Sequence, residues 1–327
     1  MSRRARFASF VAALALLLVA PLVAVVVGCP SAHAAEAAPA PAPVVVSPAE
    51  AAALLAAGGD LRLLDLRKPE EFEAAHVGGS VRLEAGPWYE RSADPKTALS
   101  NPSAWTDVFR DLGIGPRTRV LVVGGASPVA PSAAWFFLQR LGFPNASVVN
   151  GGFAALKPAL PAPLLASGPA AAPARAKEPF VPTSLPLFAT TVDKAGVRAH
   201  LASKDAVLLD VRRPREFDGS EVMRGNPRGG RIPGSCNIPH ADLLDDRGAL
   251  LAPEALRAKL EAAGLKPSDR VVVYCQGGGR SSVAAAALAL AGYTKVENYL
   301  GSFGEWSGDA SCPVEGVVTT PPGGGGK

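Results

Sequence analysis

The sequence predicts an α/β protein with two copies of one domain, each a parallel β-sheet with helices on both faces. Two observations carry this prediction. Three sequence blocks recur in the same order, and in each copy short apolar runs alternate with helical patterns. The paired blocks are LRLLDLRKPEEF (61–72) with AVLLDVRRPREF (206–217), GIGPRTRVLVV (113–123) with GLKPSDRVVVY (264–274), and VNGGFAAL (149–156) with YLGSFGEW (299–306).

The apolar runs predict buried parallel strands, because strands covered on both faces are apolar along their length. These runs are 61–66, 120–124, 206–211 and 271–275. The helical patterns cover 47–57, 105–112, 132–141, 253–263 and 281–291. Ligands of such sheets bind beyond the carboxyl ends of strands, and Cys275 stands at one such end.

Residues 1–34 have the features of a targeting segment. MSRRAR is basic, and residues 7–27 are almost wholly apolar. Three fates stay open: lipidation at Cys29 in VVGC, cleavage after AHA, or retention of an uncleaved membrane anchor. All three predict an exported protein in the periplasm or cell envelope, attached to the membrane in two of them. An Ala/Pro tether follows at 35–45.

Composition sets the remaining boundaries. We expect the first copy at 46–157, a Pro/Ala-rich linker at 158–187, the second copy at 188–317 and a disordered tail at 318–327. The chain has 33 basic and 29 acidic residues, and three of the basic ones lie in the targeting segment. The rest is nearly neutral, so we expect no nucleic-acid partner.

Three cysteines fall in the predicted folded part: Cys236, Cys275 and Cys312. An odd number leaves at least one free thiol in a monomer. No Cys-x-x-Cys pair exists and the four histidines are scattered, so we expect no metal site. We expect Cys236 to pack in the fold. A half-exposed Cys312 that serves as a resolving thiol is the disfavoured alternative for that residue.

The segment CQGGGRSS gives Cys275 its expected chemistry. Backbone amides of the loop and the start of a helix near Ser281 carry partial positive charge, and Arg280 adds a full charge. Both favour the thiolate, the nucleophilic form. The glycines allow backbone angles that other residues resist. The sequence therefore predicts an anion-binding loop around a reactive sulfur.

Such a loop can serve attack on phosphorus or on sulfur. Cysteine phosphatases need five residues between cysteine and arginine, to surround three phosphate oxygens. Here four residues separate Cys275 from Arg280. The shorter ring favours a single added sulfur atom, and a phosphatase or arsenate-handling enzyme is the disfavoured alternative.

The loop, the Asp-x-Arg blocks and GRIPGSCNIP (230–239) together resemble the rhodanese family of sulfurtransferases, and the duplication resembles its tandem members. The resemblance runs from about Val46 to Val317, without the linker. It implies two rhodanese-like domains and a nucleophile, Cys275, that carries sulfur as a persulfide. The implied binding loop is Gln276, Gly277, Gly278, Gly279, Arg280 and Ser281, and the implied supporting residues are Asp210, Arg212 and Arg231.

The first copy has Gly124 where the second has Cys275, and it contains no cysteine. It cannot form a persulfide, so we expect it to be catalytically inactive and to form one wall of the donor pocket. Tandem family members are similar in this respect.

The resemblance implies a small sulfur donor, a thiophilic acceptor and no cofactor, and we expect a monomer. Mercaptopyruvate-type members tend to have arginine at the position of Glu216, so thiosulfate or a similar donor is favoured. Arginines of the insertion SEVMRGNPRGGR, which are Arg224, Arg228 and Arg231, could reach the donor's charge. The alternative function is a non-catalytic sulfur carrier or partner-binding module of the cell envelope.

Overall fold

The computed structural model describes residues 41–169, 171–183 and 189–316. The predicted targeting segment, with Cys29, and the predicted tail lie outside these ranges. The described residues all belong to one compact unit within Pro39–Lys327. In the described ranges, no helix is both long enough and apolar enough to span a bilayer.

The first sheet has five parallel strands in the order β1-β6-β5-β2-β4. Its central strand β5 lies between β6 and β2, and Asp65 at the end of β2 pairs in register with Val123 at the end of β5. The strands are β1 (Val45–Val46), β2 (Leu61–Asp65), β4 (Val81–Arg82), β5 (Arg119–Val123) and β6 (Ala146–Val149).

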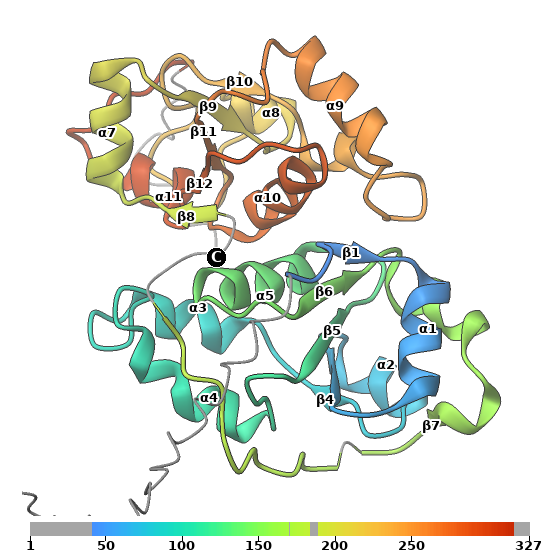
Figure 1. The fold of residues 1–327 in the computed structure, drawn as a ribbon. Helices are drawn as coiled ribbons and strands as arrows, with labels where there is room; N and C mark the ends of the chain where they lie inside the picture. Colours follow the sequence, from blue (N-terminus) through green and yellow to red (C-terminus); the bar gives the residue numbers. More distant parts are fainter. Residues whose placement is uncertain (1–40, 170, 184–188, 317–327) are drawn as a thin grey trace, which may run out of the picture. The chain divides into compact units, whose positions relative to one another are not determined.

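The second sheet has the same topology, β8-β12-β11-β9-β10 (Figure 1). Asp210 at the end of β9 pairs with Tyr274 at the end of β11, as Asp65 pairs with Val123 in the first sheet. The two halves therefore share the same strand order and the same register, in agreement with the duplication seen in the sequence blocks. The strands are β8 (Ala189–Thr191), β9 (Val207–Asp210), β10 (Cys236–Asn237), β11 (Val271–Tyr274) and β12 (Val296–Asn298).

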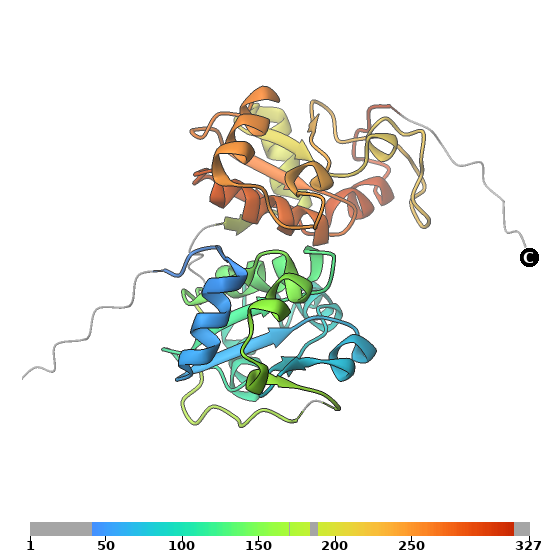
Figure 2. The same cartoon turned by 90° about the vertical axis from the view of Figure 1, so that its right-hand side faces the viewer.

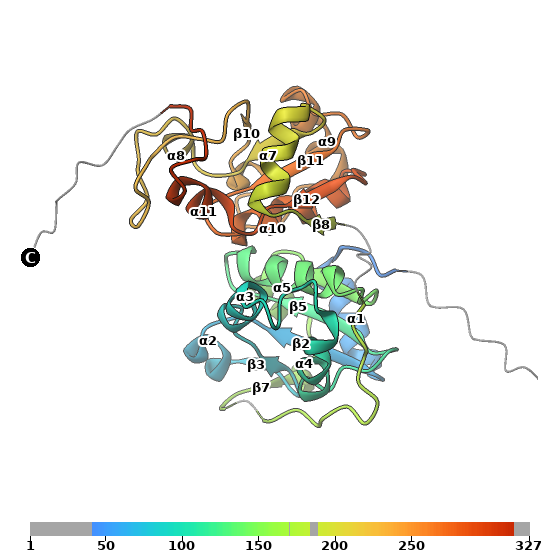
Figure 3. The same ribbon diagram turned by 90° about the vertical axis from the view of Figure 1, so that its left-hand side faces the viewer.

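Helices cover both faces of each sheet, and alternate strand residues point to opposite faces. In β5, Val120 and Val122 join one buried cluster while Leu121 and Val123 join another. In the second half, α7 and α9 lie on opposite faces of the sheet (Figure 3). The prediction of an α/β fold with two domains of this kind is confirmed.

The helices of the first half are α1 (Pro48–Ala57), α2 (Pro69–Ala74), α3 (Gly86–Ala93), α4 (Thr106–Asp111), α5 (Val129–Arg140) and α6 (Gly152–Leu156), with α1 and α6 against the same sheet face (Figure 2). Those of the second half are α7 (Lys194–Ser203), α8 (Pro214–Phe217), α9 (Pro253–Ala262), α10 (Gly279–Leu290) and α11 (Ser302–Gly308). Local signals start some of them: Ser47 and Glu50 form a capping box at α1, and Asp193 caps α7.

Some predicted boundaries differ from the structure, among them the start of α5, which lies at Val129 rather than Ser132. Helix α10 begins at Gly279 rather than near Ser281, because Gly278 takes a left-handed conformation (φ +86°) and caps it. Part of the predicted linker is also ordered as β7 (Leu165–Ala166), which pairs antiparallel with β3 (His76–Val77).

Candidate active site

Strand β11 places Cys275 at the carboxyl end of the second sheet, beside the helix that follows. Alternation along the strand puts its side chain on the same face as Val271 and Val273, within the buried cluster that includes α10. Cys275 is 1% exposed. The loop above it reaches the surface, since Gly277 is exposed. The sulfur therefore lies beneath its loop rather than on an open surface.

Two serine hydroxyls contact the Cys275 sulfur. The thiol donates to Ser281 Oγ at 3.7 Å, and Ser302 Oγ lies 3.8 Å from Sγ. Ser302 Oγ also accepts hydrogen bonds from the backbone N–H groups of Cys275 (3.1 Å) and Gly278 (3.2 Å). One hydroxyl thus ties together both ends of the loop and contacts the sulfur.

Ser302 holds this position in a left-handed backbone conformation, with φ +55°. Such a conformation is costly for a residue with a Cβ. The matching residue of the first half is Gly152, which has φ +65°. Sequence reasoning missed Ser302, although the block YLGSFGEW, paired with VNGGFAAL, marked the position.

Of the loop glycines, Gly278 alone adopts a positive φ among the three at 277–279. A Cβ on Gly278 would lie 3.1 Å from the Tyr89 ring, and one on Gly279 would lie 2.9 Å from Val129 Cγ1. Residues of the first half therefore pack directly against the loop. The charge of Cys275 adds to burial in raising the pKa of Tyr89.

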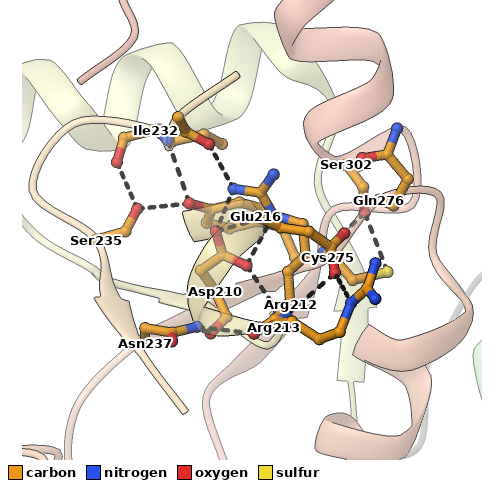
Figure 4. Close-up of polar contacts among 12 residues, drawn as sticks. Asp210, Arg212, Arg213, Glu216, Ile232, Ser235, Asn237, Cys275, Gln276 and Ser302 are labelled. Atoms are coloured by element: carbon orange, nitrogen blue, oxygen red, sulfur yellow. Dashed lines mark hydrogen bonds and ion pairs between the residues drawn. The ribbon is translucent and has the colours of Figure 1, made fainter. Parts of the chain in front are cut away.

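Arg280 lies in the first turn of α10 and already has a carboxylate partner. Its guanidinium donates to Glu216 in a bidentate pair, at 2.7 and 2.8 Å. Glu216 is fully buried and also accepts from the backbone and side chain of Arg213 (Figure 4). Burial alone would raise the pKa of Glu216, but Arg280 and Arg213 lower it to about 2.

Arg280 still lies near the sulfur. Burial alone would lower the pKa of Arg280, while the hydrogen bond to Glu216 and the charge of Cys275 raise it. Sequence reasoning expected the charge of this arginine to favour the thiolate and did not anticipate its partner. Glu216 precedes it by 64 residues, and no local pattern joins the two.

Asp210 and Arg212 form a buried pair, with Arg212 Nη2 2.6 Å from Asp210 Oδ2. Arg212 also donates to Gly230 O at 2.7 Å and lies over the Phe303 ring. Arg212 thus joins the end of β9 to Gly230 and to α11, and it makes no direct hydrogen bond to the Cys275 loop among the contacts described. The first half has an equivalent pair, Arg67 with Asp65 at 2.6 Å, without any thiol.

The arginines of the insertion take separate places. Arg228 donates to four backbone carbonyls at the end of α11, those of Trp306, Ser307, Asp309 and Cys312. Arg231 pairs with Glu315 at 3.2 Å and lies over the Phe217 ring. Arg224 is exposed. Arg228 and Arg231 therefore make no direct hydrogen bond to the Cys275 loop among the contacts described, and Arg228 instead holds the insertion against α11.

The other cysteines take no part in this arrangement. Cys312 is 1% exposed and packs in the cluster of Tyr299 and Trp306, so the disfavoured alternative of a half-exposed resolving thiol is wrong. Cys236 Sγ donates to Leu208 O at 3.5 Å, and burial raises its pKa. All three cysteines of the described residues are free thiols.

The first half has no room for a cysteine at the equivalent position. Gly124 follows Val123 as Cys275 follows Tyr274. A Cβ on Gly124 would lie 2.8 Å from the Pro131 ring. Helix α5 therefore closes the space that the sulfur occupies in the second half.

Comparisons with known proteins agree with this architecture. The model of the rhodanese-like domain matches residues 47–159 and 193–309. The chain is 28% identical to thiosulfate sulfurtransferase of Azotobacter vinelandii, over 84% of this chain and 97% of the relative. It is 30% identical to the putative thiosulfate sulfurtransferase SseB of Mycobacterium tuberculosis, over 83% and 96%. It is 27% identical to the sulfur carrier protein TtuD of Thermus thermophilus, over 74% and 86%.

Solved structures show the same fold. The crystal structure of YnjE matches with a TM-score of 0.68 and 21% identity, over 83% of this chain and 68% of that one. The wild-type structure of EanB matches with a TM-score of 0.68 and 21% identity, over 83% and 69%. With two matching domains and relatives aligned over nearly their whole length, the chain belongs to the rhodanese family as a tandem-domain sulfurtransferase.

Proposed function

We propose that the protein moves a sulfane sulfur from thiosulfate, or a similar small donor, to a thiophilic acceptor through a persulfide on Cys275. The observation that carries the proposal is the position of Cys275: it ends the central strand of one sheet and lies against the start of α10, where the helix dipole favours an anion. The equivalent place in the first half is closed by Pro131.

The chemistry is a double displacement. The Cys275 thiolate attacks the outer sulfur of thiosulfate. A bond forms between Cys275 Sγ and that outer sulfur, and the bond between the two sulfur atoms of thiosulfate breaks. Sulfite leaves with that electron pair. An acceptor such as cyanide then attacks the outer sulfur, forms thiocyanate and returns the Cys275 thiolate. The loop 276–281 would hold the persulfide anion, and no cofactor takes part.

The buried sulfur suits a small donor. Cys275 is 1% exposed while Gly277 above it is exposed, so a compact anion fits the approach better than a protein thiol. Glu216 also stands where mercaptopyruvate-type members tend to have arginine. This second point favours thiosulfate over 3-mercaptopyruvate.

The test is intact-mass analysis after incubation with thiosulfate, with Cys275→Ser as the matched variant. We expect one added sulfur atom on the native protein and none on the variant, together with ping-pong kinetics for thiosulfate and cyanide. An unmodified native protein, or a variant that gains the same mass, would contradict the proposal.

A sulfur carrier is the second candidate. One relative is named a sulfur carrier protein, and the Arg280 charge is already paired with Glu216. A carrier would gain one sulfur atom from thiosulfate and release it to cyanide at a negligible rate. Steady-state turnover, measured after persulfide formation is shown, separates the two functions.

We further propose that the first domain, 46–157, is catalytically inactive and that the protein is exported. The support is the absence of a cysteine in that domain and the apolar segment after MSRRAR. Fractionation of the native host, with mass analysis of the mature N-terminus, distinguishes a lipidated Cys29, a cleaved chain and an uncleaved anchor. A full-length chain in the cytosol would contradict export.

A further inference from the structure

The insertion, bounded in the structure by Gly219 and Gly230, joins α8 to Arg231 and the residues before β10. Between the matched positions Phe72/Phe217 and His76/Arg231, the first half has three residues (73–75) and the second half has thirteen (218–230). The half that carries a thiol therefore has the insertion, and the half without a thiol lacks it. This difference led us to ask what the insertion contacts.

The base of the insertion is closed by backbone packing. Gly219 and Gly230 both have positive φ, +84° and +103°. A Cβ on Gly219 would lie 2.1 Å from Gly316 O, and one on Gly230 would lie 2.1 Å from Glu315 O. Only glycine fits at either place, so the two ends of the insertion are fixed beneath the backbone at 315–316.

Arg228, near the end of the insertion, is fixed to α11. Its guanidinium donates to four carbonyls in the last turn of that helix and just after it, at 2.6 to 3.2 Å. The start of the same helix holds the Cys275 loop, because Phe303 N–H donates to Cys275 O (3.0 Å) and Gly304 N–H donates to Gln276 O (2.9 Å). The insertion and the loop thus share one rigid support.

One side chain links the insertion to the loop directly. Asn226 Oδ1 accepts from Gln276 Nε2 at 2.7 Å, and Asn226 Nδ2 donates to Gln276 Oε1 at 3.2 Å. The two amides satisfy each other in both directions. Gln276 follows Cys275 in the chain, and its backbone and side chain are both held.

We propose that Asn226 is a positioning residue for sulfur transfer at Cys275, and that it acts by fixing Gln276 through this reciprocal amide pair. The proposal rests on the proposed function. With Gln276 held by the insertion through its side chain and by α11 through its carbonyl, the first residue of the loop stays in place. A loop that already has the conformation needed to bind the persulfide does not have to rearrange during sulfur transfer.

The experiment follows the single-turnover rate of persulfide formation on Cys275 with thiosulfate, by rapid quench and intact mass. Asn226→Ala and Gln276→Ala should each slow this step about tenfold, and together no further, because both break the same pair. Melting temperature should fall by less than about 4 °C, since the pair is only part-buried. Ser220→Ala, on the exposed part of the insertion, is the matched control and should keep the native rate.

The exchanged pair Asn226→Gln with Gln276→Asn keeps the summed side-chain length and both amides. It should recover most of the native rate, while each exchange alone should not. Amide hydrogen exchange should quicken at Gly277 and Gly278 in the alanine variants and stay native elsewhere. Native rates in the alanine variants, or additive losses without recovery in the exchanged pair, would overturn the proposal. If the native protein itself gains no sulfur, the proposed function fails instead.

Discussion

Arg280 and Glu216 form a bidentate pair beside the candidate nucleophile, with Arg280 Nη1 2.7 Å and Nη2 2.8 Å from the two carboxylate oxygens. Glu216 is wholly buried and Arg280 is mostly so, so the pair is poorly screened by solvent. The loop therefore presents less free positive charge to an anionic donor than its sequence suggests. Glu216 becomes a determinant of how strongly thiosulfate is drawn in.

Replacing Glu216 with Gln tests this role. The Arg280 charge loses its partner, so the KM for thiosulfate should fall, and the free energy of unfolding should fall by about 3 kcal/mol because a buried pair is broken. Steady-state kinetics at fixed ionic strength and chemical denaturation measure the two effects. Glu221→Gln, which removes a more exposed partner of Arg213, is the control and should change neither by much. An unchanged KM for thiosulfate in Glu216→Gln would count against the idea.

The Glu216 carboxylate also predicts that the free energy of unfolding decreases at acid pH. Its pKa is lowered from 4.5 to about 2, so its contribution is fully present above pH 4.5 and is lost as pH falls toward 2. The contribution is about 3 kcal/mol. Denaturant unfolding of the native protein and of Glu216→Gln between pH 2 and 6 should show a flatter pH dependence for the variant. Parallel curves would contradict this assignment.

Ser302 allows its strain and its hydroxyl to be separated. Ser302→Gly removes both, whereas Ser302→Ala removes the hydroxyl and keeps the left-handed backbone (φ +55°). The glycine variant should be more stable than the alanine variant by about 1 kcal/mol. Both should form the Cys275 persulfide more slowly, since both lose the acceptor for two loop N–H groups. Chemical denaturation measures the stability of the two variants, and rapid-quench mass analysis measures the rate of persulfide formation. Equal stability of the two variants would argue against backbone strain at Ser302.

Installing a thiol in the first half should not create a second sulfur site. In Gly124→Cys the new Cβ meets the Pro131 ring at 2.8 Å, so the variant should be destabilised by about 1 to 3 kcal/mol. Intact mass after thiosulfate should still show one added sulfur atom. Two added sulfur atoms on Gly124→Cys would refute the prediction, provided that one is lost when Cys275→Ser is added and that the native protein gains only one.

His200 predicts a change of stability near neutral pH. Its Nδ1 lies 2.8 Å from Asp205 and its Nε2 lies 3.1 Å from Glu297. Burial alone would lower the pKa of His200, but the two carboxylates raise it above 6.5. Its contribution is therefore fully present below pH 6.5 and is lost as pH rises through the raised value. NMR titration of the imidazole and unfolding at pH 5.5 to 8.5 test this, with His200→Asn as the reference; an imidazole that titrates below 6.5 would contradict it.

The long central strands were predictable, and the short ones were not. VLVV and VVVY are buried on both faces and read as continuous apolar runs. Edge strands such as Val81–Arg82 and Cys236–Asn237 are two residues long, so they leave no pattern in the sequence. Their existence depends on pairing with strands distant in the chain.

The position of Cys275 could be predicted because a strand, a glycine-rich loop and a helix adjoin it in the sequence. Its partners could not. Glu216 and Ser302 reach the loop from 64 and 27 residues away. The burial of Cys312 depends likewise on packing against Trp306 and Tyr299. Long-range contacts, rather than local propensity, account for each of these differences.

The backbone at Glu315–Gly316 crosses the base of the insertion, and this has a consequence for protein engineering. A shortened protein that stops before Glu315 would lose the carbonyls over Gly219 and Gly230 and the strand-like bridge to Arg231. These two residues thus help to hold the insertion whose Asn226 contacts Gln276. Shortened variants and deletion libraries should therefore keep Glu315 and Gly316.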